Sequence, residues 1–150
     1  MKKSTVALVL ICLLVGGYFA FEAEWGRSLL LRFFSPDRDT VNQMALAFME
    51  DIRFKDFDKA ATYHSPEDQT KVDIPKLIER LFQIKPETLD IMEYEILDTT
   101  LDSSGQRARV KLKTKVHILN KDEIRNPELI LYFHNKDGNW YMELESSLHK

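Results

Sequence analysis

Residues 107–118 show the clearest pattern in the chain, a strict alternation of apolar and basic side chains. Ala, Val, Leu, Thr, Val and Ile take every second position, and two Arg, three Lys and a His take the positions between them. Successive side chains of a β-strand point to opposite faces of the sheet. The alternation therefore predicts a strand with one buried face and one solvated face.

Other strands are predicted on both sides of this one. From residue 89 onward the hydrophobic period is two, and Met92, Tyr94 and Ile96 are expected to point inward. Two more strands are predicted at residues 128–134 and 139–145. Because turn sequences separate consecutive strands, the pattern indicates a four-stranded antiparallel meander.

The part of the chain before residue 89 has a helical period instead. A capping box predicts a first helix that begins at Thr40 and runs for about thirteen residues. Asp56 is expected to cap a short second helix, and Asp73 a third helix that stops before Pro86. The fold class predicted from these patterns is α+β, with three helices packed on the sheet.

The amino-terminal segment has the pattern of a membrane anchor. Residues 6–21 carry no charge and follow Lys2 and Lys3, which are expected to stay on the cytoplasmic side. Suitable small residues for signal cleavage are missing, so a retained anchor is favoured over a cleaved signal peptide. We therefore expect residues 4–21 to cross the inner (cytoplasmic) membrane once, with the domain beyond them periplasmic or extracellular.

Composition supports this division of the chain. Residues 1–36 form the predicted anchor and juxtamembrane segment, and residues 37–150 are long enough for one modest core. The second part holds 17 of the 21 basic and 22 of the 24 acidic side chains, a net charge of −5, which argues against nucleic acid as a partner. Cys12 is the only cysteine and no glycosylation sequon is present, so a bacterial envelope protein is favoured.

The globular part resembles the nuclear transport factor 2-like superfamily. The resemblance lies in residues 54–61 (FKDFDKAA), 65–67 (SPE) and 136–141 (KDGNWY), and it extends over residues 39–144. It implies a curved sheet wrapped around helices to form a cone, often with a pocket at the open end. The superfamily includes small isomerases and dehydratases, polyketide cyclases, transport adaptors and membrane-anchored subunits of secretion machines, so the fold leaves the function open.

An enzyme with this shape would need an acid or a base that points into the cone. The inward positions of the two clearest strands contain no carboxylate, so catalysis is not expected and no catalytic residue is assigned. Periodicity places Phe48, His64, Phe82, Tyr94 and Trp140 on inward faces, so one interpretation is that they simply form the core. The other is an apolar pocket, suited to a small apolar ligand, lined by His64, Tyr94, Phe82 and Trp140. The four histidines lack ligand spacing, so neither a metal nor another cofactor is expected.

The basic side of the central strand is the other candidate site. We call Arg107, Arg109, Lys111, Lys113 and Lys115 the basic stripe. One interpretation is a solvated face whose charges pair with acidic side chains such as Glu93, Glu95, Glu143 and Glu145. The other is a docking site for an acidic protein, a second copy of the chain, or anionic lipid headgroups.

Together these patterns favour a non-enzymatic, membrane-anchored envelope protein that acts through protein contacts of its exported domain, with another protein or with itself. The alternative is a binding protein for a small apolar ligand, or an isomerase-like or dehydratase-like enzyme that uses the cone pocket.

Overall fold

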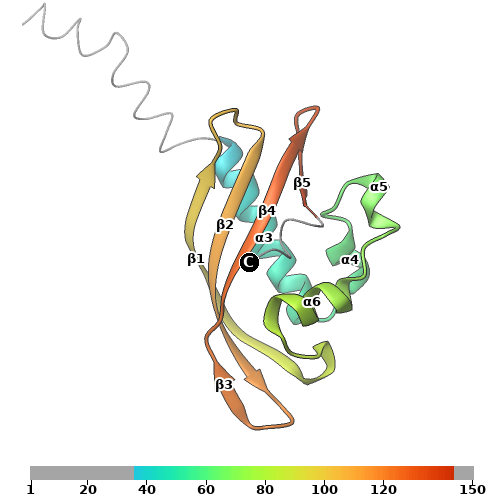
Figure 1. Cartoon of the computed structure of the whole chain (residues 1–150), viewed down its shortest axis with the longest axis vertical. Coiled ribbons are helices and arrows are strands. Elements are labelled where there is room, and N and C mark those ends of the chain that lie inside the picture. Colours follow the sequence, from blue (N-terminus) through green and yellow to red (C-terminus); the bar gives the residue numbers. More distant parts are fainter. Residues whose placement is uncertain (1–35, 144–150) are drawn as a thin grey trace, which may run out of the picture. The chain divides into compact units, whose positions relative to one another are not determined.

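The structure is a computed structural model, and it describes residues 36–143. This part of the chain is α+β, with helices first and a curved antiparallel sheet after them (Figure 1). Within the described residues, no helix has the length and apolar character needed to cross a membrane. The predicted membrane segment, residues 4–21, lies outside this part.

Four α-helices and one short 3-10 helix precede the sheet within the described residues. They are α3 (Pro36–Arg53), α4 (Phe57–Ala61), α5 (Pro66–Gln69), α6 (Ile74–Phe82) and η1 (Pro86–Thr88). The predicted start of the first helix at Thr40 is wrong, because α3 already begins at Pro36. Proline is favoured at the start of a helix, and the acidic Asp37 and Asp39 in the first turn interact favourably with the helix dipole.

The caps predicted for the next helices are confirmed. The side chain of Asp56 accepts a hydrogen bond from the backbone N–H of Lys59, and Asp73 does the same for Lys76. The prediction of three helices is wrong, because α5 follows α4 as a separate turn of helix. Pro66 occupies the first turn of α5, a position at which proline is favoured.

Five strands form one sheet in the described residues, so the prediction of four strands is wrong. They are β1 (Leu89–Leu101), β2 (Arg107–Ile118), β3 (Glu123–Arg125), β4 (Glu128–Lys136) and β5 (Asn139–Met142). The order is β1-β2-β4-β5, with β3 paired to the end of β2, and every pairing is antiparallel. The strand β3 was missed because three exposed or half-exposed residues carry no hydrophobic period.

Two β-bulges interrupt the pairing of β1 with β2. The register shifts between Ile91 and Glu93 and again between Ile96 and Asp98, so Met92 and Leu97 are the extra residues. Each bulge changes the phase of the alternation by one residue. As a result Leu89 and Ile91 are buried, and Met92, which was predicted to point inward, is 37 % exposed. Tyr94 and Ile96 do pack against the core, as predicted.

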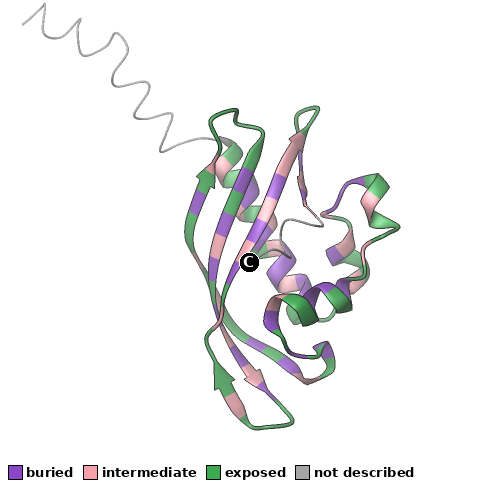
Figure 2. Ribbon diagram, viewed as in Figure 1, coloured by how far each residue is buried: buried purple, intermediate pink, exposed green. Residues whose placement is uncertain are grey.

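The core lies between the helices and one face of the sheet, and Figure 2 shows the buried positions alternating along the strands. Phe48 and Met49 of α3 are fully buried, as are Leu112 of β2 and Phe133 of β4. We call the opposite face, which carries the basic stripe, the outer face. The described helices lie on the inner side only (Figure 1), so the side chains of the outer face meet solvent.

Candidate functional site

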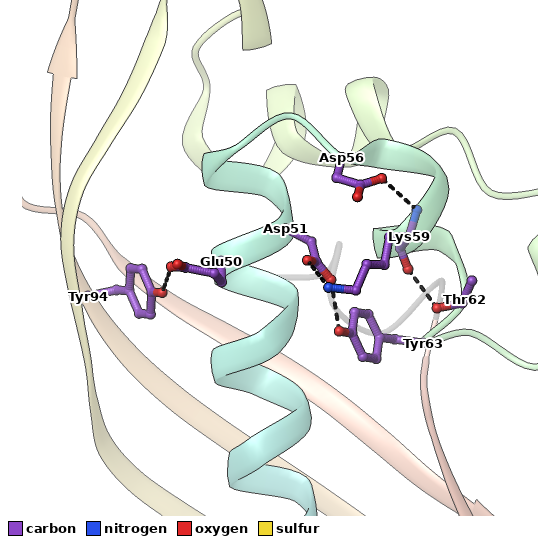
Figure 3. A network of polar contacts seen from close by, with 7 residues as sticks. All are labelled: Glu50, Asp51, Asp56, Lys59, Thr62, Tyr63 and Tyr94. Atoms are coloured by element: carbon purple, nitrogen blue, oxygen red, sulfur yellow. Dashed lines mark hydrogen bonds and ion pairs between the residues drawn. The ribbon is translucent and has the colours of Figure 1, made fainter.

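Asp51 of α3 is a buried carboxylate, with only 5 % of the residue exposed. Its Oδ1 accepts a hydrogen bond of 2.8 Å from Nζ of Lys59, and its Oδ2 accepts one of 2.8 Å from the Tyr63 hydroxyl (Figure 3). Lys59 lies on α4 and Tyr63 follows that helix. Because a buried charge is costly unless it is paired and hydrogen-bonded, these contacts fix α4 against α3.

The protonation states in this network are clear. Burial, and then the hydrogen bond to Asp51, raise the pKa of Tyr63 to about 12. The hydrogen bond to Asp51 also raises the pKa of Lys59 above its ordinary value. At neutral pH the phenol is therefore protonated and the amine is charged. Both groups are engaged with Asp51, so the network acts as a structural connection between helices.

The neighbouring residue, Glu50, points away from a different side of α3 than Asp51 does (Figure 3). Figure 3 shows its carboxylate directed toward Tyr94 of β1, and the Tyr94 hydroxyl donates a hydrogen bond to Oε2 of Glu50. Nη1 of Arg53 lies 4.0 Å from the same oxygen. Burial, and then the hydrogen bond to Glu50, raise the pKa of Tyr94 to about 12. Tyr94 is thus a protonated hydrogen-bond donor at neutral pH.

A hollow of about 460 Å³ adjoins Tyr94. Its lining residues are Arg53, Glu93, Tyr94, Glu95, Lys113, Thr114, Lys115 and Asn126. Charged side chains of both signs and an amide therefore surround this space. Such a lining suits a polar or zwitterionic molecule better than the small apolar ligand that the sequence suggested.

The structure does not bring the four predicted pocket residues together at this hollow. Tyr94 lines it, whereas His64, Phe82 and Trp140 are absent from its lining. Phe82 and Trp140 are buried core residues with 5 % and 6 % exposure. Nε1 of Trp140 donates a hydrogen bond of 3.1 Å to Asp37, which ties the start of α3 to β5.

His64 is fully buried next to the last strand. It forms an isolated parallel bridge with Met142 of β5, and Nδ1 lies 3.3 Å from the carbonyl oxygen of Ala61. A carbonyl can only accept, so Nδ1 carries the proton, and Nε2 is left without a hydrogen-bond partner. Burial is the main cause that lowers the pKa of His64. His64 is therefore a neutral core residue at neutral pH.

The basic stripe lies on the outer face, as predicted, and β1 provides acidic neighbours for much of it. The register places Glu93 opposite Lys115, Glu95 opposite Lys113, and Asp98 opposite Lys111. The ion pairs of the stripe are Lys115 with Glu93 at 3.2 Å, Lys113 with Glu95 at 3.8 Å, Lys111 with Glu128 at 2.6 Å, and Arg107 with Glu143 at 3.8 Å. The predicted partners Glu93, Glu95 and Glu143 are thus confirmed, and Glu145 lies outside the described residues.

Metal binding has no support in the part of the chain that is described. Among residues 36–143, no group of three or more His, Cys, Asp or Glu side chains is arranged to hold a metal ion. His117, which was expected to point outward beside the lysines, lies 2.8 Å from Oδ1 of the exposed Asp122.

Glu50 and Asp51 are the polar residues that the sequence reasoning missed. The search for an inward carboxylate considered the strands, whereas both residues lie on α3. A signal for Asp51 was present, because it follows the predicted core position Phe48 by three residues and therefore shares its helix face. The signal for Glu50 was weaker, since its contact with Tyr94 depends on how α3 packs on β1.

Comparison with known proteins does not assign the chain to a family. No family model matches it, and no curated protein matches it. The geometry of the described residues is therefore the basis for the functional argument.

Proposed function

We propose that this chain is a membrane-anchored protein of a bacterial envelope, and that its exported domain acts by protein contact through the outer face of its sheet. The anchor is residues 4–21, and the exported domain is residues 37–150. The curved antiparallel sheet with helices on its inner side supports a nuclear transport factor 2-like domain. A domain of this kind can serve as an adaptor without any chemistry of its own.

The observation that carries the proposal is the character of the outer face. It is an open sheet surface that the described helices leave uncovered (Figure 1). Besides the basic stripe, it presents the half-buried side chains Ile130, Tyr132, His134 and Tyr141 of β4 and β5. Tyrosine and arginine are enriched at protein interfaces, because they combine a large contact area with directed hydrogen bonds.

The interior gives less support to catalysis. The buried Asp51 is bound by Lys59 and Tyr63, and the Glu50 carboxylate accepts from Tyr94. Carboxylates that already accept hydrogen bonds from neighbouring side chains have little capacity to bind and activate a substrate. The remaining buried titratable side chain, His64, does not line the hollow beside Tyr94.

In-cell photo-crosslinking tests the contact proposal. A photoreactive side chain at position 134 or 113, on the outer face, is expected to give a discrete adduct with another protein. The same side chain at position 112 is the matched control, because Leu112 is fully buried on the inner face. Absence of an adduct from both outer positions, with the protein folded and in the membrane fraction, would remove the proposal.

A second function is favoured by one observation, the hollow of about 460 Å³ beside Arg53 and Tyr94. A small polar ligand could donate a hydrogen bond to the Tyr94 hydroxyl oxygen and pair with the Arg53 guanidinium. An isomerase-like or dehydratase-like reaction at this site has less support, because Glu50 does not line the hollow and its carboxylate already accepts from Tyr94. A ligand screen by thermal shift tests ligand binding, since a ligand of this hollow should stabilise the wild type and not Tyr94→Phe or Arg53→Ala.

A further inference from the structure

The two ends of the basic stripe have different surroundings. Lys111, Lys113 and Lys115 form the lysine end, and each makes an ion pair with a glutamate of β1 or β4. Arg107 and Arg109 form the arginine end. Among residues 36–143 Arg109 forms no ion pair, and Arg107, whose side chain is 75 % exposed, has only the distant Glu143 at 3.8 Å.

The register explains the difference. Across the sheet Arg109 lies between Thr100 of β1 and Tyr132 of β4, so neither direct neighbour is acidic. Arg107 lies opposite His134, which in turn lies opposite Tyr141. The rings of His134 and Tyr141 are 5.9 Å apart. The last acidic side chain of β1 is Asp98, opposite Lys111, and Asp102 follows the end of the strand.

The arginine end is also hollowed. A space of about 320 Å³ is lined by Thr100, Leu101, Asp102, Arg107, Ala108, Arg109, Tyr132, Phe133 and Glu143. Two guanidinium groups and Tyr132 thus border a surface depression, together with the carboxylates of Asp102 and Glu143. Ala108 and Phe133 of the lining are buried core residues. A guanidinium binds a carboxylate with two parallel hydrogen bonds and stacks on aromatic rings, which an ammonium group does not do.

We infer that the arginine end is the docking site on the outer face, and that its partner is an acidic segment of another protein. The inference rests on the proposed function and narrows it to one part of the face. A carboxylate of the partner pairs with Arg109, and the apolar part of the partner chain lies against Tyr132. The lysine end contributes little affinity, because its charges are already neutralised by the protein's own glutamates.

Peptide binding to the full chain in detergent micelles tests this inference. The probe is a fluorescent ten-residue peptide of alternating glutamate and serine, and fluorescence anisotropy reports the binding. Arg107→Gln combined with Arg109→Gln should weaken binding about tenfold or more, because charge-assisted hydrogen bonds are lost. Lys113→Gln combined with Lys115→Gln is the matched control and should change the affinity by less than about twofold.

Each outcome is decisive. Equal losses in the two double variants would mean general electrostatic attraction and would overturn the arginine site. No binding of the peptide to the wild type, or equal binding of a lysine–serine peptide, would overturn the acidic partner. Self-association that the arginine variant abolishes would make a second copy the occupant, which also contradicts the inference. Adducts from position 113 without any from position 134, which lies opposite Arg107, would refute the inference and leave the proposed function standing.

Discussion

Asp51 is the residue at which the fold depends most on a single polar group. Its carboxylate is buried, and both oxygens accept hydrogen bonds of 2.8 Å. Asp51→Ala should lower the free energy of unfolding by about 2 to 3 kcal/mol, because hydrogen bonds to a charged group are lost and the Tyr63 hydroxyl loses its acceptor. Denaturant unfolding measures the loss.

Two further variants serve as references for the loss of stability in Asp51→Ala. Tyr63→Phe removes one of the hydrogen bonds and should cost about 1 kcal/mol. Glu79→Ala removes an exposed carboxylate from α6 and should change the stability by less than about 0.5 kcal/mol. A cost for Asp51→Ala no larger than that for Glu79→Ala would contradict the structural role of the network.

His64 predicts a pH dependence of stability. Its pKa is lowered in the folded state, mainly by burial, from an ordinary value of 6.5. Above that pH both states hold a neutral imidazole, and the group contributes nothing. Below it the unfolded chain binds the proton first, so the free energy of unfolding should fall by up to about 1.4 kcal/mol per pH unit until the folded pKa is reached.

The variant His64→Gln isolates this contribution. Unfolding is measured between pH 7.5 and pH 5 for both proteins, and the difference in slope is assigned to His64. The wild type should lose more stability with falling pH than the variant. Parallel curves would show that His64 takes up a proton without penalty, contrary to its buried, neutral state.

At the residue scale, the sequence predicted whether a side chain is buried or exposed better than it predicted which residues contact one another. The burial of His64, Phe82 and Trp140 was expected from hydrophobic periodicity, and so was the solvent exposure of the basic stripe. Periodicity assigns a face within one element, whereas a site requires distances between elements. This is why His64 and Tyr94 were grouped in one pocket, and why the contact of Glu50 with Tyr94 was not foreseen.

The element that departs most from a simple pattern is β1. Each of its two bulges shifts the alternation of side chains by one residue. Residues 89 and 91, then 94 and 96, then 99 and 101 therefore face the core. A uniform alternation centred on Met92 could not reveal this, because a bulge is visible only in the pairing with β2. The strands β2, β4 and β5 lack such shifts. β2 has its predicted ends, whereas β4 extends two residues beyond its predicted end at residue 134 and β5 ends at Met142 instead of residue 145.

Deletion of Met92 should be tolerated, because Met92 is the extra residue of the first bulge. Without it, Ile91 opposite Val116 and Glu93 opposite Lys115 would form consecutive pairs, so Leu89 and Ile91 would still face the core. We expect the deletion variant to keep cooperative unfolding. Met92→Thr keeps the bulge and should change the stability by less than about 0.5 kcal/mol, since Met92 is partly exposed.

Circular dichroism and denaturant unfolding measure both variants. A deletion variant that loses cooperative unfolding would contradict this pairing, in which Met92 is the extra residue of β1.

For the whole molecule, the fold class follows from pattern alone, because the change from a helical period to a period of two near residue 89 separates the helices from the sheet. The added elements α5 and β3 are short, and short elements depend on tertiary contacts more than on local sequence. The account of function depends on the outer face, where an open sheet carries neutralised lysines at one end and arginines with aromatic neighbours at the other.

The size of the assembly that contains the arginine variant, measured after extraction from the membrane, tests this account most directly. The full chain, wild type or carrying Arg107→Gln and Arg109→Gln, is extracted in mild detergent and separated by native electrophoresis. The account predicts that the wild type migrates in a larger assembly and that the variant migrates at its own mass with unchanged circular dichroism. A folded variant that stays in the same assembly would contradict it.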